Sequence, residues 1–224
     1  MTHVRALAVA GPDQAAAVQE VDIPEPVAGQ VRVRTAAASI NGIDRSLAAG
    51  HLWGMPHTFP VVVGRDFAGV VDRVGDDVTS LAEGDRVAGV YTAMDLHVGT
   101  VAEAVTIEAG LVVPIPDAVT AEQAAATGLA AVTALDLVDA LKLTADDVVL
   151  VSGATGGVGT FAVQLAAATG SVNTCWRSVS RNLVQVGSSR ASRYSGWLPA
   201  GPIVRVVNSC RSTARAFSSI GLTC

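Results

Sequence analysis

Short stretches in which apolar and polar residues alternate follow one another over the first half of the chain. The clearest is Val31-Arg32-Val33-Arg34, in which both valines fall on one face, as in a strand that is buried on one side. Similar segments, separated by Gly, Asp and Pro residues, cover residues 4–10, 18–23, 61–63, 67–74, 86–90 and 102–107. Many short strands at close spacing predict an antiparallel β barrel or sandwich over residues 1–115.

The pattern becomes helical after Pro114 and Pro116. Thr120 and Gln123 have the spacing of a capping box, in which each side chain bonds the backbone of the other residue. An alanine-rich helix is expected to about residue 129 and a second one over about 132–141, where apolar residues recur at helical spacing. We therefore expect a helical linker over residues 116–146.

The most informative segment is VVLVSGATGGVGTFAVQLAAATG, residues 148–170. Its first four residues are apolar, as in a strand buried on both faces of a parallel sheet, and apolar residues recur at helical spacing before Gly170. Glycines lie between the predicted strand and the predicted helix. A helix N-terminus offers unpaired N–H groups to a phosphate, and glycine, which has no side chain, lets the phosphate approach the backbone closely. A glycine-rich tight turn without a ligand is the alternative.

Strand, glycine turn and helix in this order predict the start of a doubly wound nucleotide-binding domain at residues 147–170. The predicted dinucleotide-binding residues are Gly153, Ala154, Thr155, Gly156, Gly157, Val158 and Gly159.

Composition narrows the class of protein. The 224 residues are 50% hydrophobic and 16% charged, which is typical of a well-buried α/β protein. The net charge of −5 gives no general attraction to nucleic acid or anionic membranes, and no uninterrupted apolar run reaches the ~18 residues of a membrane-spanning helix. The first residues indicate a strand rather than a signal peptide, so we expect a cytoplasmic protein.

The last 54 residues differ abruptly from the rest. Residues 171–224 contain all three cysteines and seven arginines but no Lys, His, Asp or Glu, so they carry +7 where residues 1–170 carry −12. Two interpretations are open, a basic interaction segment or a change of reading frame in the coding sequence, and we favour the second. The best strand candidate in this tail is Ile203–Val207.

Several motifs occur together in the order found in one enzyme family. They are AASINGID at 37–44, GRDFAGVV at 64–71, GDRV at 84–87, AVTA at 131–134 and GATGGVG at 153–159. Together they resemble the medium-chain dehydrogenase/reductase superfamily and, within it, the zinc-free quinone oxidoreductase branch. The resemblance covers about residues 1–170 and implies an α/β fold, with an N-terminal GroES-like β barrel followed by the first part of a Rossmann doubly wound domain. It also implies NADPH as cofactor and a quinone, enone or related carbonyl compound as substrate, bound between the domains.

The chain departs from the zinc-dependent members of that family at two positions. Those members have Cys and His where this chain has Asn41 and Arg65. Residues 1–170 contain no cysteine, and the four histidines show no ligand spacing, so we expect no metal. His51 and His57 are interpreted as solvated loop residues.

Without a metal, catalysis depends mainly on positioning the hydride donor and on a hydrogen-bond donor for the oxygen that becomes negative. The resemblance places Asn41 near the nicotinamide, where its amide can donate, so Asn41 is the candidate catalytic and cofactor-binding residue. An ordinary Asn-Gly turn is the alternative. Thr133 resembles a family threonine at the nicotinamide end, and a packing threonine is its alternative. Asp44 is interpreted as an N-cap or salt-bridge residue and Asp66 as a structural turn residue, so neither is given a catalytic role.

Discrimination between NAD and NADP is expected near residues 173–180, at the end of the next strand. Arg177 and Arg181 would suit a 2′-phosphate, but they lie in the anomalous tail. The prediction of NADPH therefore rests on the resemblance, and NADH is the alternative cofactor. The hypothesis is a zinc-independent NADPH-dependent oxidoreductase with a small-molecule substrate. It has no nucleic-acid or membrane partner, and whether it forms a homodimer is left open. The alternative is a catalytically silent, truncated reductase-like protein that acts at most as a nucleotide-binding or interaction module.

Overall fold

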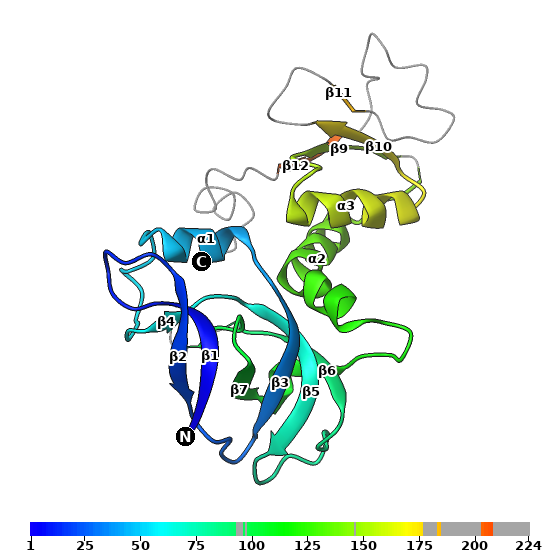
Figure 1. The fold of residues 1–224 in the computed structure, drawn as a ribbon. Coiled ribbons are helices and arrows are strands. Elements are labelled where there is room, and N and C mark those ends of the chain that lie inside the picture. Colours follow the sequence, from blue (N-terminus) through cyan, green and yellow to red (C-terminus); the bar gives the residue numbers. More distant parts are fainter. Residues whose placement is uncertain (93–95, 97, 146, 177–182, 185–202, 208–224) are drawn as a thin grey trace. The chain divides into compact units, whose positions relative to one another are not determined.

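The computed structural model describes residues 1–92, 96, 98–145, 147–176, 183–184 and 203–207 (Figure 1). The chain divides into two compact units, Met1–Leu129 and Ala130–Cys224. The boundary falls inside the segment that the sequence predicts as a helical linker, residues 116–146. Each unit is described by itself.

Two antiparallel sheets form the first unit, as the alternating pattern predicts. The smaller sheet has the order β2-β1-β4, with β1 (Thr2–Val9), β2 (Ala17–Ile23) and β4 (Val61–Val62). The larger has the order β7-β3-β5-β6-β8, with β3 (Gln30–Ser39), β5 (Asp66–Val74), β6 (Arg86–Val90), β7 (Ala104–Glu108) and β8 (Val112–Pro114). The helix α1 (Gly42–Ala48) follows β3, and a 3-10 turn (Ala109–Leu111) precedes β8.

The two faces of β3 are buried in different ways. Val31 and Val33 are fully buried in an apolar cluster with Phe67 of β5, so the period-two pattern identified the core face. Arg32 is also buried, and its guanidinium is held by Asp72 at 2.9 Å and by Glu25. A buried guanidinium with carboxylate partners does not leave an unpaired charge in the interior.

The two expected helices are present as the two parts of α2 (Ala121–Leu141), which meet at a kink with non-helical backbone at Gly128. Its capping box has formed: the N–H of Thr120 donates to the Gln123 side chain at 3.0 Å, and the N–H of Gln123 donates to Oγ1 of Thr120 at 3.2 Å. Ala124 and Ala125 pack against Ala68 of β5. By length and composition α2 could also cross a membrane, but one such helix is weak evidence because core helices pass the same test.

The described part of the second unit contains a four-stranded sheet with the order β11-β10-β9-β12. The strand β9 (Val148–Ser152) lies between β10 (Val172–Trp176) and β12 (Ile203–Val207) and runs parallel to both, while β11 (Leu183–Val184) is antiparallel to β10. The helix α3 (Gly157–Ala168) connects β9 to β10. The fold is therefore α/β: a GroES-like β domain followed by the first part of a Rossmann domain.

The core of the second unit centres on β9. Val149 and Val151 are fully buried, with half-buried Leu137 and Leu141 of α2 and Val163 of α3 packed against them. Val149 and Val151 lie on one face of β9, which is the apolar strand that the sequence predicts for the parallel sheet.

Candidate functional site

The glycine turn between β9 and α3 is closed by its own backbone. Gly153 has a φ of +76°, which favours glycine, and its carbonyl accepts the N–H of Gly156 at 2.9 Å. A Cβ atom at position 159 would overlap the carbonyl oxygen of Gly153 and lie 2.8 Å from the Cα of Ala154. Position 159 therefore accepts only glycine, because the first turn of α3 packs directly against the backbone of the glycine turn.

The N-terminus of α3 carries no side chain that would compete with an anion or repel it. Gly156 caps the helix without a side-chain bond, and no acidic residue stands in the first turn. The hydroxyl of Thr160 donates to the carbonyls of Gly156 at 2.8 Å and Ala154 at 3.2 Å, which holds the turn in place. The first N–H groups of a helix have no intrahelical partner, so this turn fits the pyrophosphate of a dinucleotide.

The structure brings the predicted cofactor residues 153–159 together in this turn, where Thr155, Gly156 and Gly157 are exposed. Thr133 lies on α2 in the same unit and is half-buried. Asn41 belongs to the first unit. Arg177 and Arg181 lie outside the described residues.

Asn41 begins the helix α1 rather than closing a simple Asn-Gly turn. It is the N-cap residue, and its backbone N–H donates to Oδ2 of Asp44 at 2.7 Å. Its side-chain Nδ2 donates to Oδ2 of Asp66 at 2.7 Å and to Oγ of Ser39 at 3.3 Å. Both amide hydrogens therefore have partners within the protein.

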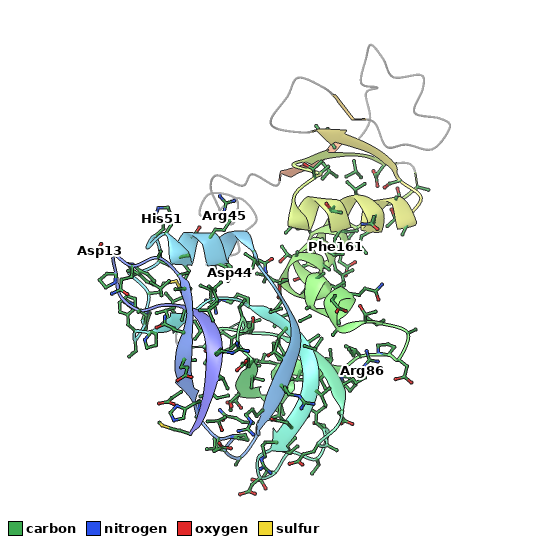
Figure 2. The ribbon with its side chains drawn as sticks, viewed as in Figure 1. Asp13, Asp44, Arg45, His51, Arg86 and Phe161 are labelled. Atoms are coloured by element: carbon green, nitrogen blue, oxygen red, sulfur yellow. The ribbon has the colours of Figure 1, made fainter. Side chains whose placement is uncertain are left out.

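Asp44 is a buried carboxylate held by backbone donors. Its exposed fraction is 2%, and Oδ1 accepts the N–H of Gly64 at 3.1 Å. Figure 2 shows the Asp44 side chain on the strand side of α1, opposite that of Arg45. The pKa of Asp44 is raised, chiefly by burial. The hydrogen bonds from Asn41 and Gly64 lower it in part, as does the charge of Arg65.

Asp66 was expected to be a structural turn residue, and the structure gives it more contacts than that. It is the first residue of β5 and only 1% exposed. Besides Asn41 it accepts the hydroxyl of Ser39 and the backbone N–H of Leu129, the latter at 2.7 Å. The only signal for it in the sequence is a carboxylate placed directly before an apolar strand.

Arg65 is buried next to these carboxylates. Its exposed fraction is 4%, and its guanidinium carbon lies 5.4 Å from the centre of the Tyr91 ring, within cation–π range. Its charge acts on the carboxyl of Asp44. The positions of Asn41 and Arg65 thus carry an amide and a guanidinium, neither of which is a usual zinc ligand.

The two loop histidines differ in their surroundings. His51 is exposed, as expected, but His57 is half-buried among aromatic rings. Its ring centre lies 5.2 Å from that of Trp53 and 5.0 Å from that of Phe59, so it is not a solvated loop residue. Among the residues that the structure describes, no group of three His, Cys, Asp or Glu side chains could hold a metal ion.

Comparison with known proteins places this geometry in a family. Residues 27–117 match the alcohol dehydrogenase GroES-like domain. The quinone oxidoreductase of Sus scrofa is 34% identical over 171 residues, which cover 76% of this chain and 50% of that protein. The trans-enoyl reductase thnE of Trichoderma harzianum is 34% identical over 183 residues, which cover 73% of this chain and 48% of that reductase.

A similar fold occurs in the solved structure of the quinone oxidoreductase from Coxiella burnetii. It superposes with a TM-score of 0.71 at 28% identity, covering 78% of this chain and 56% of that one. The chain spans about half the length of the two curated relatives just named. The β domain, the glycine turn and these relatives together show that the chain belongs to the medium-chain dehydrogenase/reductase superfamily, in the quinone oxidoreductase-like branch.

Proposed function

We propose that this chain belongs to a zinc-independent, NADPH-dependent oxidoreductase that transfers a hydride to a quinone, an enone or a related carbonyl compound. The observation that carries the proposal is the glycine turn at Gly153–Gly159, which occurs in a chain whose relatives are named as a quinone oxidoreductase and a trans-enoyl reductase. NADH is the open alternative as cofactor.

In this proposal the glycine turn holds the pyrophosphate of the cofactor. Glycine at buried position 159 lets α3 begin directly against the backbone of Gly153, and the N-terminus of α3 supplies N–H donors. The bound nicotinamide supplies the hydride. Thr133 is proposed to contact the nicotinamide end.

Asn41 is the proposed donor for the substrate oxygen. Its bond to the Asp66 carboxylate, at 2.7 Å, is charge-assisted and firm, whereas its bond to the Ser39 hydroxyl, at 3.3 Å, is long. The second amide hydrogen is therefore the one that can exchange its acceptor, the Ser39 hydroxyl, for a carbonyl oxygen at low cost. A donor at that place stabilises the negative charge that develops as hydride arrives.

The proposal needs no metal for charge stabilisation, and it includes a cytoplasmic location with neither nucleic acid nor membrane as partner. The net charge of −5 supports the statement on nucleic acid.

A second candidate is a catalytically silent nucleotide-binding module. The observation that favours it is the abrupt change of composition after Gly170, because the residues there lack the acidic residues and lysines of an ordinary enzyme domain.

One set of measurements separates these functions. NADPH and NADH are titrated against the full chain by fluorescence, and cofactor oxidation is then followed with a panel of quinones and enones. Saturable binding with turnover supports the reductase, and saturable binding without turnover on any acceptor supports the silent module. No saturable binding by a chain with a folded circular dichroism spectrum contradicts both.

A further inference from the structure

Three donors converge on the buried carboxylate of Asp66. Oδ2 accepts Nδ2 of Asn41 at 2.7 Å and the hydroxyl of Ser39, and Oδ1 accepts the N–H of Leu129 at 2.7 Å. Because an ionised carboxylate only accepts hydrogen bonds, the nitrogen of the Asn41 amide must face it and the oxygen must face away from it. Asp66 therefore fixes which way round the Asn41 amide stands.

The carboxylate is itself held in place from the side of α2. Leu129 directly follows the kink at Gly128, and its N–H reaches Asp66 as the first turn of a helix reaches a capping carboxylate. A Cβ atom at position 128 would lie 2.5 Å from Oδ1 of Asp66, so the glycine leaves space for the carboxylate. At the other end of the residue, the Asp66 carbonyl accepts the hydroxyl of buried Thr100 at 2.8 Å.

We propose that Asp66 is the positioning residue of Asn41. It orients the amide, keeps one amide hydrogen firmly bonded and leaves the other on the long bond to Ser39, ready for a substrate oxygen. This inference rests on the proposed function, in which Asn41 donates to the substrate.

The variant that tests the proposal is Asp66→Asn, which keeps the size of the side chain and an oxygen for the N–H of Leu129. Its new NH₂ group faces the NH₂ group of Asn41, so the Asn41 amide must turn over to remain bonded. The matched control is Asp72→Asn, because Asp72 lies in the same strand and binds a buried guanidinium, that of Arg32. Both variants remove one carboxylate from β5, and only one of them touches Asn41.

The first readout is the NMR signal of the Asn41 side-chain amide in ¹⁵N-labelled protein, which needs neither cofactor nor substrate. We expect one shifted, slowly exchanging amide proton in the original protein and in Asp72→Asn. In Asp66→Asn this proton should lose its shift and exchange about tenfold faster, since a bond to a charged acceptor is gone. Unchanged Asn41 signals in Asp66→Asn would overturn the proposal.

The second readout is steady-state kinetics. Asp66→Asn should lower kcat about tenfold while the NADPH Kd changes less than about threefold, because the affected donor acts on the reacting oxygen and not on the pyrophosphate. Asp72→Asn should leave both constants within about twofold. Equal kcat values in the two variants would also overturn the proposal.

A reciprocal exchange separates positioning from stability. Asn41→Asp alone places two carboxylates together and should lower Tm, and the double variant Asn41→Asp/Asp66→Asn should recover Tm because an amide again faces a carboxylate. We expect no recovery of kcat, since the donor at position 41 is lost, and recovery of both would contradict the role of Asp66. If the original chain binds NADPH but reduces no acceptor, the proposed function has failed, and the NMR readout alone decides on Asp66.

Discussion

The two units of this protein bury their apolar residues in different ways. In the first unit the main cluster, which includes Val31, Phe67 and Val105, draws on several strands of a five-stranded sheet. In the described part of the second unit, the cluster centres on Val149 and Val151 of the single strand β9. A core shared among many strands tolerates the loss of one partner, whereas a core on one strand depends on each neighbour of that strand. The glycine turn that follows β9 therefore depends on the two strands that flank β9.

The largest effect should come from ending the chain at Gly170. Both strands that flank β9, namely β10 and β12, lie after this residue, so β9 would lose its hydrogen-bonding partners in the sheet. We expect loss of NADPH binding and of the unfolding transition of the second unit, with the transition of the first unit unchanged. Calorimetry and cofactor titration on the shortened and full chains measure this.

The opposite result would be equally informative. If the shortened chain is as stable and binds as well, residues 171–224 add no core and the reading-frame hypothesis gains support. In that case one of the other two frames of the coding sequence should encode alternating strands and helices with ordinary numbers of Asp, Glu and Lys.

Phe67→Ala should produce the next largest effect and confine it to the first unit. Phe67 is fully buried, and its ring fills the space beside Gly89, so its removal leaves a cavity. The free energy of unfolding of the first unit should fall by about 3–5 kcal/mol in urea titrations. Val113→Ala, at a position that is 61% exposed, is the control and should have little effect. A comparable loss in the second unit would show that the two units do not unfold separately.

Gly159→Val tests the proposed cofactor role of the glycine turn. The new side chain would overlap the backbone of Gly153, so NADPH affinity should fall about tenfold or more while the β domain keeps its stability. The control is Gly110→Ala, outside the glycine turn, because a Cβ there meets no atom within 4 Å. Unchanged affinity in Gly159→Val would remove this glycine from the proposed site.

The smallest effect should be the pH dependence contributed by Asp44. Its pKa is raised in the folded protein, chiefly by burial, so the folded state binds this proton more tightly than the unfolded state does. The contribution of Asp44 to stability is therefore fully present in acid, below the unfolded pKa, and declines as the pH rises through the raised pKa. The stability of the original protein relative to Asp44→Asn, measured by urea unfolding from acid to neutral pH, should fall as the pH rises. A difference that grows with pH would contradict the raised pKa.

The sequence predicted the features that depend on local pattern. The alternation around Val31 identified a core strand, the apolar run before Gly153 identified a parallel strand, and Thr120 with Gln123 form the expected capping box. Each of these signals lies within a few neighbouring residues, where spacing alone carries the information.

The sequence could not predict contacts between distant residues. Asp66 read as a turn residue because the N–H that it accepts belongs to Leu129, 63 positions away. His57 read as solvated because its aromatic neighbours are placed by the path of a loop, which periodicity does not describe. Tertiary contacts override local preference at such sites, and sites of this kind are where function is often found.

The close approach of Gly128 to Asp66 also has a consequence for how this sequence can change over time. Because a side chain at 128 and a carboxylate at 66 compete for one volume, position 128 cannot gain a side chain while Asp66 keeps its carboxylate. A lineage that acquires alanine at 128 must first shorten residue 66, and it then loses the acceptor for Leu129 and Asn41 together. Related sequences with a side chain at position 128 should therefore carry a residue shorter than aspartate at position 66, and alanine at 128 together with aspartate at 66 should be rare.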